Sequence, residues 1–305
     1  MKKVLITGIS GGQGRLVAKR LLGRMEITGV DRIPWEGPPE GVTVHTLDLR
    51  KRGFENIFRH ERPDAVVHLA FIRHFRFDPR VRHEVNVEGT QRLLENCARY
   101  EVKRVVVLSS SYVYGALPDN PRYIREDHPL NVSRTFPDLR DLAEVEGLVN
   151  TFLWRYPDIR TAILRPVNTL GYYVHSAIGT YFKLDVVPTV AGFDPMMQFI
   201  HEEDLAEAIA LTLENELHGI YNVVGPGAVP LKTAIEAIGR RRMSIPEPLA
   251  HLVIRQLFRF KMYSFPPEAL DFIKYPCTVC GERFYRATGF EPLFSLEDTF
   301  ASVAR

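Results

Sequence analysis

The residues best suited to chemistry stand near the start of the chain, where three glycines are spaced as G-x-x-G-x-x-G. Gly8, Gly11 and Gly14 follow an apolar run at residues 3–7 and lead into a helical pattern at residues 16–22. Glycine permits a tight turn, a close approach of backbone N–H groups to a ligand, and close packing of the helix on the strand. Because a helix N-terminus also attracts anions, this pattern is typical of a pyrophosphate-binding turn.

The acidic residue that accompanies such a turn is also present, about 20 residues beyond the glycines. Residues 27–30 predict a second strand, and Asp31 ends it. A carboxylate there can accept hydrogen bonds from both ribose hydroxyls of a dinucleotide and repels a 2′-phosphate. This favours NAD as the cofactor. Arg32 follows directly and could hold that phosphate, so NADP stays as the alternative.

Strand and helix patterns alternate along the chain and must position these residues. We predict helices at residues 85–100 and 138–156, and strands at residues 3–7, 27–31, 42–45, 65–69, 104–108, 161–164 and 220–223. This alternation indicates an α/β Rossmann fold, a doubly wound parallel sheet with a smaller C-terminal substrate lobe. We expect the dinucleotide-binding domain at residues 1–167 and about 198–224, and the lobe at about 168–197 and 225–305.

Composition narrows the class of protein. The 305 residues carry a formal net charge of +2, which gives no reason to expect a nucleic-acid partner. No run of about 20 apolar residues and no signal-peptide pattern is present, so we expect a cytoplasmic location and no membrane partner. We interpret the amphipathic run at residues 249–260 as a lobe helix over the substrate pocket, with a membrane-surface helix as the alternative.

The cysteines give no sign of a metal or a disulfide framework. Their number is odd, and Cys277-x-x-Cys280 has neither a second pair nor a neighbouring histidine. We therefore interpret Cys97, Cys277 and Cys280 as free thiols and predict no metal site.

Further motifs follow the glycine turn in a fixed order. They are Asp48-Leu49, His68-Leu69-Ala70, Asn86-Val87-x-Gly89-Thr90, Ser109-Ser110-x-x-Val113-Tyr114-Gly115, Leu164-Arg165-Pro166 and Phe199-Ile200-His201-x-x-Asp204-Leu205-Ala206. In these motifs the chain resembles the extended short-chain dehydrogenase/reductase superfamily, which holds the NAD-dependent epimerases and dehydratases. The resemblance implies that Ser110 hydrogen-bonds a substrate oxygen. It also implies cofactor contacts at Gly8, Ser10, Gly11, Gly12, Gln13, Gly14, Asp31, Arg32, Asp48, Leu49, Leu69, Ala70, Phe71, Asn86, Leu108, Pro166 and Asn168.

The catalytic pair of that superfamily is missing. Its members carry Tyr-x-x-x-Lys on the helix after the serine, whereas alignment on residues 143–146 places Asp138 and Leu142 there. In a shifted register the pair becomes Phe136 and Arg140, which also lacks the tyrosine. Met197 stands where relatives use an arginine to hold a diphosphate, which counts against a nucleotide-sugar substrate.

Several residues are candidates to replace the lost tyrosine. Ser110 and Ser111 can position an oxygen, Asp138 could act as an acid if burial raised its pKa, and Tyr172 could donate a proton. The alternatives are a helix cap for Asp138 and packing for Tyr172 and Tyr173. His74 and His83 lie in a basic, aromatic stretch that we interpret as a solvated loop; attraction of an anionic or aromatic substrate is the alternative.

Three functions fit these features. The first is an atypical NAD(P)-dependent oxidoreductase that moves a hydride between the cofactor and a small-molecule carbonyl or alcohol. The second is a nucleotide-sugar epimerase or dehydratase with an unusual acid, and the third is a catalytically idle NAD(P)-binding sensor or scaffold. The resemblance also implies a homodimer, in which the helices at residues 85–100 and 138–156 would meet through Leu93, Leu94, Leu142, Val145 and Val149.

Overall fold

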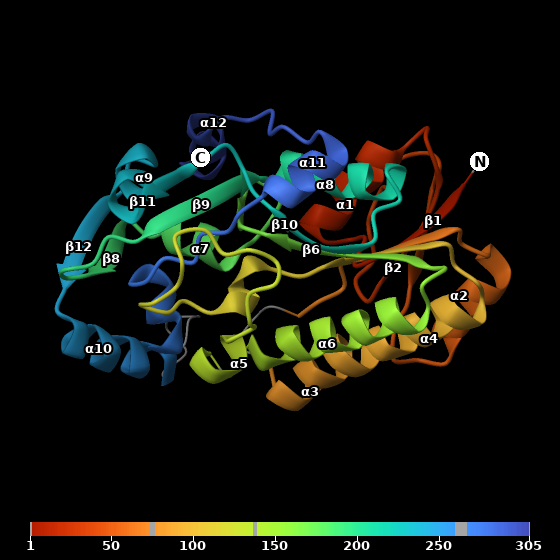
Figure 1. Ribbon diagram of the computed structural model, residues 1–305, viewed down its shortest axis with the longest axis horizontal. Helices are drawn as coiled ribbons and strands as arrows, with labels where there is room; N and C mark the ends of the chain where they lie inside the picture. Colours follow the sequence, from red (N-terminus) through yellow and green to blue (C-terminus); the bar gives the residue numbers. More distant parts are fainter. Residues whose placement is uncertain (1, 73–76, 137–138, 260–266, 305) are drawn as a thin grey trace.

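The computed structural model describes residues 2–72, 77–136, 139–259 and 267–304 of the chain. Its central strands are β1 (Lys3–Thr7), β2 (Glu26–Asp31), β3 (Val42–Thr46), β4 (Ala65–His68), β5 (Arg104–Leu108), β6 (Arg160–Pro166) and β10 (Gly219–Val223). They form one parallel sheet in the order β10-β6-β5-β4-β1-β2-β3 (Figure 1). The predicted Rossmann sheet is confirmed, and the predicted strand ends are correct to within two residues.

Helices cover both faces of this sheet because successive strand residues point to opposite sides. Val4 and Ile6 of β1 pack in one core cluster, and Leu5 packs in the other. The first face carries α1 (Gly12–Leu21), α8 (Glu202–Glu214) and α11 (Glu282–Thr288) (Figure 1). The second carries α2 (Gly53–Glu61), α4 (Gly89–Arg99) and α6 (Arg140–Arg155).

The sheet extends to both sides of the central strand β1. β2 and β3 lie on one side of β1, and β4, β5, β6 and β10 lie on the other. Because all seven strands are parallel, their carboxyl ends meet at one edge of the sheet, and the order of strands reverses between β1 and β4. Ligands of open α/β sheets bind at such a switch point.

A second group of elements packs beside the sheet (Figure 1). β7 (Asn168–Leu170), β9 (Met196–His201) and β11 (Ala228–Pro230) form one small sheet, and β8 (Val186–Val190) pairs with β12 (Arg241–Ile245). Their helices are α7 (Ala177–Phe182), α9 (Leu231–Ala237), α10 (Glu247–Arg259), the 3₁₀ helix η4 (Pro267–Ile273) and α12 (Leu296–Ala304). The rings of Phe182, Phe199 and Phe300 pack at the centre of this group.

The apolar run predicted as a lobe helix forms α10. Its Ala250 is buried with Leu270 of η4, so one side of the helix packs on the lobe. Leu249 and Leu252 remain 49% and 55% exposed. Among the described residues, no helix has both the length and the apolar character needed to cross a membrane.

Both predicted long helices form, with changes at their ends. The first begins as a π-helical turn, η1 (Glu84–Glu88), which follows the short helix α3 (Pro79–His83) and continues as α4. The second is α6, preceded by the short helix α5 (Val132–Thr135). The 3₁₀ turn η2 (Ser111–Tyr114) follows β5. Isolated π turns in helices often mark functional sites, and this one carries the predicted site residue Asn86.

The residues predicted to join two subunits lie instead inside the monomer. Leu93 and Leu94 of α4 and Leu142, Val145 and Val149 of α6 are at most 4% exposed. They form the inward-facing stripes of these helices and pack in the two core clusters of the sheet. The prediction that these five side chains supply contacts between subunits is therefore wrong.

Candidate functional site

The glycine turn joins β1 to α1 at the carboxyl edge of the sheet. Gly8 has a φ of +75°, and a Cβ there would lie 2.8 Å from the backbone nitrogen of Ala70. A Cβ on Gly14 would lie 2.3 Å from the Gly8 oxygen, so only glycine allows the helix to start this close to the strand. Gly11 precedes α1 without a side-chain cap. The first-turn N–H groups of the helix therefore form a cradle suited to a phosphate.

A distant loop packs directly on this cradle. A Cβ on Gly12 would lie 2.1 Å from the carbonyl oxygen of Tyr173. The carboxylate of Glu202, at the start of α8, accepts the N–H groups of residues 172–174 at 2.7–3.1 Å. Burial raises the pKa of Glu202, and these N–H groups oppose the rise. Gln13 donates to the Glu202 carbonyl oxygen at 3.3 Å, which ties the same loop and helix to the phosphate turn.

The predicted ribose-binding carboxylate lies beside the cradle. Asp31 ends β2 and accepts the backbone N–H of Ser10 at 3.0 Å and that of Ile33 at 3.1 Å. The Ser10 hydroxyl donates to the Ile33 carbonyl at 2.7 Å. The structure therefore brings the predicted cofactor-binding residues Ser10 and Asp31 together, while Arg32 is exposed next to them.

Asp48 and Leu49 follow β3 at the same edge of the sheet. Arg50 contacts both oxygens of Asp48, with its Nη2 2.7 Å from Oδ2, and this hydrogen bonding lowers the pKa of the carboxyl group. Arg50 also pairs with Glu84 at 2.7 Å. Leu49 is 5% exposed and packs in the core cluster beside α4. Asp48 thus remains ionised and is held by arginine.

Asn86 fixes the segment that follows β4. Its Oδ1 accepts the Ile72 N–H at 2.8 Å, and its Nδ2 donates to the Ile72 carbonyl at 3.1 Å. Leu69, Ala70 and Phe71 lie between that anchor and the strand, next to the Gly8 turn. Asn86 therefore acts on this segment from a distance of 14 residues along the chain.

The predicted serines lie at the end of β5, directly after Leu108. Ser110 is half-buried and caps η2, where its Oγ accepts the N–H of Tyr112 at 3.3 Å. Ser111 is only 2% exposed. Ser109 hydrogen-bonds Glu146 through its side chain. Of the three serines, Ser110 thus combines a place at the edge with partial exposure.

A buried ion pair joins α6 to β6. Arg165 of β6 contacts both oxygens of Glu146, with its Nε 3.0 Å from each, and both side chains are at most 3% exposed. Leu142 lies one helical turn earlier and is 4% exposed in an apolar cluster. In the alignment on residues 143–146, the position of the superfamily's lysine is thus a core side chain; in the shifted register it is the exposed Arg140. Asp138 lies outside the described residues.

The structure leaves the phenol of Tyr172 largely in solvent. Its side chain is 66% exposed and meets Tyr173 edge to face, with ring centroids 5.1 Å apart. The cation of Lys19 lies 5.6 Å from the Tyr173 ring centroid. The two tyrosines contribute mainly through their backbone, which rests on the phosphate turn.

A tyrosine that the sequence analysis does not single out contacts the predicted site residue Asn168. Tyr112 donates its hydroxyl to Asn168 Oδ1 at 2.6 Å. Asn168 begins β7, just after Pro166 ends β6, and its Nδ2 donates to the Gln198 carbonyl at 2.9 Å. The signal in the sequence is the position of Tyr112, two residues beyond Ser110 within a predicted site motif.

The cysteine pair behaves as two separate thiols. Cys277 lies 3.5 Å from the Ser111 carbonyl oxygen, and burial raises its pKa to about 12. Such a thiol is protonated near neutral pH and is a poor nucleophile. Cys280 is half-buried and is also free.

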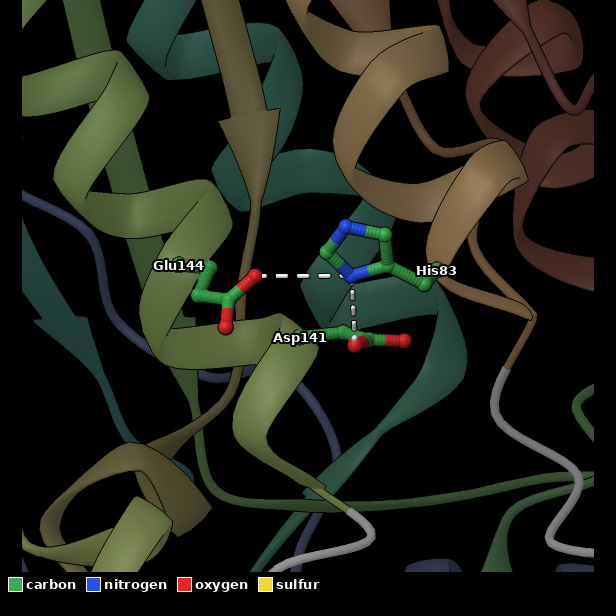
Figure 2. A group of neighbouring side chains, drawn as sticks. All are labelled: His83, Asp141 and Glu144. Carbon is green, nitrogen blue, oxygen red and sulfur yellow. Dashed lines mark hydrogen bonds and ion pairs between the residues drawn. The ribbon is translucent and has the colours of Figure 1, made fainter. Parts of the chain in front are cut away.

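Figure 2 shows a cluster of His83 from α3 with Asp141 and Glu144 from α6. His83 Nδ1 lies 3.3 Å from Asp141 and 3.4 Å from Glu144. The guanidinium of Arg82 lies 3.5 Å from Asp141, so a positive charge already faces this carboxylate. We interpret the cluster as an ion-pair network that joins α3 to α6. His74, from the same predicted stretch, lies outside the described residues.

A cavity of about 450 Å³ opens in the segment after η2. None of the predicted site residues lines it. Its walls come from Leu117, Asp119, Asn120, His128, Pro129, Asn131, Arg134 and Thr135.

Comparison with known proteins supports one family. The sequence model described as "NAD dependent epimerase/dehydratase family" matches residues 4–224. An uncharacterized protein of Mycobacterium tuberculosis is 29% identical over 260 residues, which cover 80% of this chain and 68% of that protein. UDP-glucose 4-epimerase of Bacillus subtilis is 29% identical over 219 residues, covering 63% of this chain and 61% of the enzyme. The crystal structure of the Thermus thermophilus UDP-glucose 4-epimerase complexed with NAD is 25% identical, with a TM-score of 0.78 and coverage of 99% and 97%.

Proposed function

Because the chain belongs to the NAD-dependent epimerase/dehydratase family, we propose that it binds NAD and moves a hydride between nicotinamide and a small-molecule carbonyl or alcohol. The observation that carries this proposal is the phosphate cradle at Gly11 with Asp31 fixed beside it. The N–H groups at the start of α1 suit a pyrophosphate, and Asp31 suits a ribose diol. Similar proteins crystallised with NAD share the fold.

We propose that different residues of this chain contact different parts of the cofactor. The turn would hold the pyrophosphate, Asp31 the adenosine ribose, and Asp48 with Leu49 the adenine. Leu69, Ala70 and Phe71 would line the path toward the nicotinamide, positioned by Asn86. The remaining contacts we propose are Ser10, Gln13, Arg32, Leu108, Pro166 and Asn168. The bound cofactor would supply the hydride or accept it.

Asp31 supports NAD over NADP. Its two oxygens are oriented by the N–H groups of Ser10 and Ile33, so the carboxylate keeps its place beside the turn. A 2′-phosphate at that place would meet a negative charge. Arg32 is exposed and would have to overcome this repulsion to hold NADP.

Around the reacting carbonyl, we propose that this chain offers a hydroxyl group. Ser110 would hydrogen-bond the substrate oxygen from the end of β5. In the alignment on residues 143–146, Leu142 supplies no charge at the place of the lysine.

A nucleotide-sugar epimerase or dehydratase is the second candidate, favoured by the names of the relatives. Two side chains at the diphosphate-binding positions argue for the first candidate. Met197 is 6% exposed in the core of the lobe, and Gln198 binds both backbone groups of Val279 at 2.7–3.1 Å. Neither can grip a diphosphate as an arginine does.

We also propose the division into domains and a homodimer built on α4 and α6. The contacts between subunits must then come from the outer faces of these helices, where Trp154 is 76% exposed. Sedimentation at micromolar concentration tests this: a monomer would contradict the proposed dimer.

The activity test follows absorbance of NADH and NADPH with ketones, quinones, aromatic carbonyls and nucleotide sugars. Products are also separated by chromatography, because epimerisation causes no net change in cofactor. Reduction of a carbonyl that falls in Ser110→Ala supports the oxidoreductase. Conversion of a nucleotide sugar establishes the second candidate instead. Tight cofactor binding with no turnover of any compound contradicts both and favours a sensor.

A further inference from the structure

Tyr112 presents a phenol at the carboxyl edge of the sheet. It is the second residue of η2, and its backbone N–H is bonded to the Oγ of Ser110. Its hydroxyl lies 2.6 Å from Asn168 Oδ1. Asn168 Nδ2 donates to the Gln198 carbonyl, so the oxygen end of the amide must face the tyrosine. This arrangement holds the phenol between the end of β5 and the start of β7.

The surroundings of Tyr112 are apolar. Its ring lies 4.4 Å from that of Phe272, and Phe136 and Val132 complete a buried cluster. Burial, with a smaller effect from the nearby Cys277, raises the pKa of the Tyr112 hydroxyl above its ordinary value. The group therefore keeps its proton throughout the neutral range. It can donate a proton to a strong base and is a poor base itself.

The superfamily's tyrosine is missing in both alignments of α6, so another proton donor is needed for the proposed reaction. In the alignment on residues 143–146, the lysine position is the buried Leu142. Tyr172, the tyrosine predicted from the sequence as a possible donor, is 66% exposed. Tyr112, by contrast, is partly buried and lies two residues from the predicted substrate-binding serine.

We propose that the Tyr112 hydroxyl is the proton donor in carbonyl reduction, acting beside Ser110 and oriented by Asn168. This inference rests on the proposed function. In the step, a hydride passes from C4 of the dihydronicotinamide to the carbonyl carbon, forming a C–H bond and oxidising NADH to NAD⁺. The carbonyl π electrons move to oxygen, which takes the Tyr112 proton to give the alcohol. The phenolate then regains a proton from water.

This assignment predicts how each direction of the reaction depends on pH. An alkoxide is a strong enough base to take a proton from a phenol. In alcohol oxidation the tyrosine would have to be deprotonated first, and nothing at the Leu142 position favours that form. The rate of alcohol oxidation should therefore rise with pH above neutral. The reduction rate should stay constant from about pH 6 to 9, because the donor is protonated throughout.

Tyr112→Phe tests the proposal, with Tyr221→Phe as the matched control. Tyr221 also loses one hydroxyl bond, to the His218 carbonyl at 3.2 Å, at the opposite edge of the sheet. The carbonyl used is the panel member that the unmutated protein reduces fastest. We expect kcat to fall about 10²-fold in Tyr112→Phe and to stay within about twofold in the control. NADH affinity, from fluorescence titration, should be unchanged in both.

A binding measurement provides a second readout. Calorimetry with the protein–NAD⁺ complex gives the affinity for the same carbonyl without turnover. Tyr112→Phe loses one hydrogen bond to the carbonyl oxygen, so its affinity for the carbonyl should fall about 2–10-fold. The affinity of the Tyr221→Phe control should not change.

Two results would overturn the role of Tyr112 while leaving the proposed function intact. The first is a Tyr112→Phe enzyme with kcat within about threefold of the unmutated protein. The second is a reduction rate that titrates between about pH 6 and 8, as expected for a carboxyl or imidazole donor. Failure of the unmutated protein to bind NADH or to reduce any carbonyl would instead overturn the proposed function, and this inference with it.

Discussion

Replacing Gly12 by alanine is expected to destabilise the protein, because the added methyl group has no room. The new Cβ would lie 2.1 Å from the Tyr173 carbonyl oxygen and 2.5 Å from its carbon. Ordinary contacts of a Cβ begin near 3.4 Å. The loop at residues 172–174 would therefore have to retreat by the difference, roughly 1.3 Å.

Glu202 resists this movement and determines its cost. Its carboxylate receives three backbone N–H groups from the loop at 2.7–3.1 Å, and the side chain is 2% exposed. Retreat of the loop would break at least one of these bonds, at about 1.5–3 kcal/mol for a charged acceptor. Overpacking adds about 1–3 kcal/mol. The free energy of unfolding should thus fall by about 2.5–6 kcal/mol.

The assay is urea unfolding followed by tryptophan fluorescence, with Gly147→Ala as the control. Gly147 lies within α6, and a Cβ there meets nothing within 4 Å. Alanine should stabilise that helix by about 0.5–1 kcal/mol. If Gly12→Ala unfolds within about 1 kcal/mol of the unmutated protein, the loop does not rest on the helix start as described, and the reasoning is refuted.

Three further predictions concern titratable or charged side chains that are buried or held in place by hydrogen bonds. Burial lowers the pKa of His68 to about 4, so this histidine binds a proton more readily when the chain is unfolded, and stability is lost as pH falls from 6.5 toward 4. Urea titrations at pH 7 and pH 5 should show about 2 kcal/mol more loss in the unmutated protein than in His68→Asn; equal losses would contradict this. Glu146→Gln should cost about 3–5 kcal/mol by leaving the Arg165 guanidinium buried without its carboxylate, and the double variant Glu146→Leu/Arg165→Met should recover part of that loss in the same assay. Asp31→Ala should weaken NADH binding about tenfold or more and NADPH binding much less, measured by fluorescence titration; parallel losses would show that Asp31 does not read the ribose.

The parallel sheet and the phosphate turn could be predicted because their signals are local. A strand such as Ala65–His68 is buried on both faces and is continuously apolar up to its last residue. Gly8 and Gly14 are glycines for reasons that involve residues a few positions away or the neighbouring strand. Asp31 likewise needs only the second strand to bring it beside the turn.

The remaining parts of the site depend on contacts between distant segments. Tyr112 meets Asn168 across 56 residues, and Glu202 meets the loop at residues 172–174 across about 30. The periodicity of apolar residues in the sequence does not predict contacts between such distant segments. The subunit contacts were predicted wrongly for a related reason. In the sequence, an apolar stripe on a helix looks the same whether it faces a second subunit or the sheet. In the structure, Leu93 and Val145 pack against the sheet.

Gly12 packs on the loop at residues 172–174, and Gln13 bonds Glu202 at the start of α8. These contacts have a consequence for the order of folding. The turn itself is encoded within the first 14 residues, but the hydrogen bond from Gln13 reaches across 189 residues of chain. During synthesis, the N-terminal strands can pair and the turn can form long before the loop at residues 172–174 and Glu202 are in place. A nascent chain that ends before residue 202 would carry the phosphate cradle and the loop at residues 172–174, but not the Glu202 carboxylate that holds this loop. We therefore expect tight retention of a dinucleotide to be a late event in the maturation of this protein, reached only after Glu202 has been synthesised and has docked.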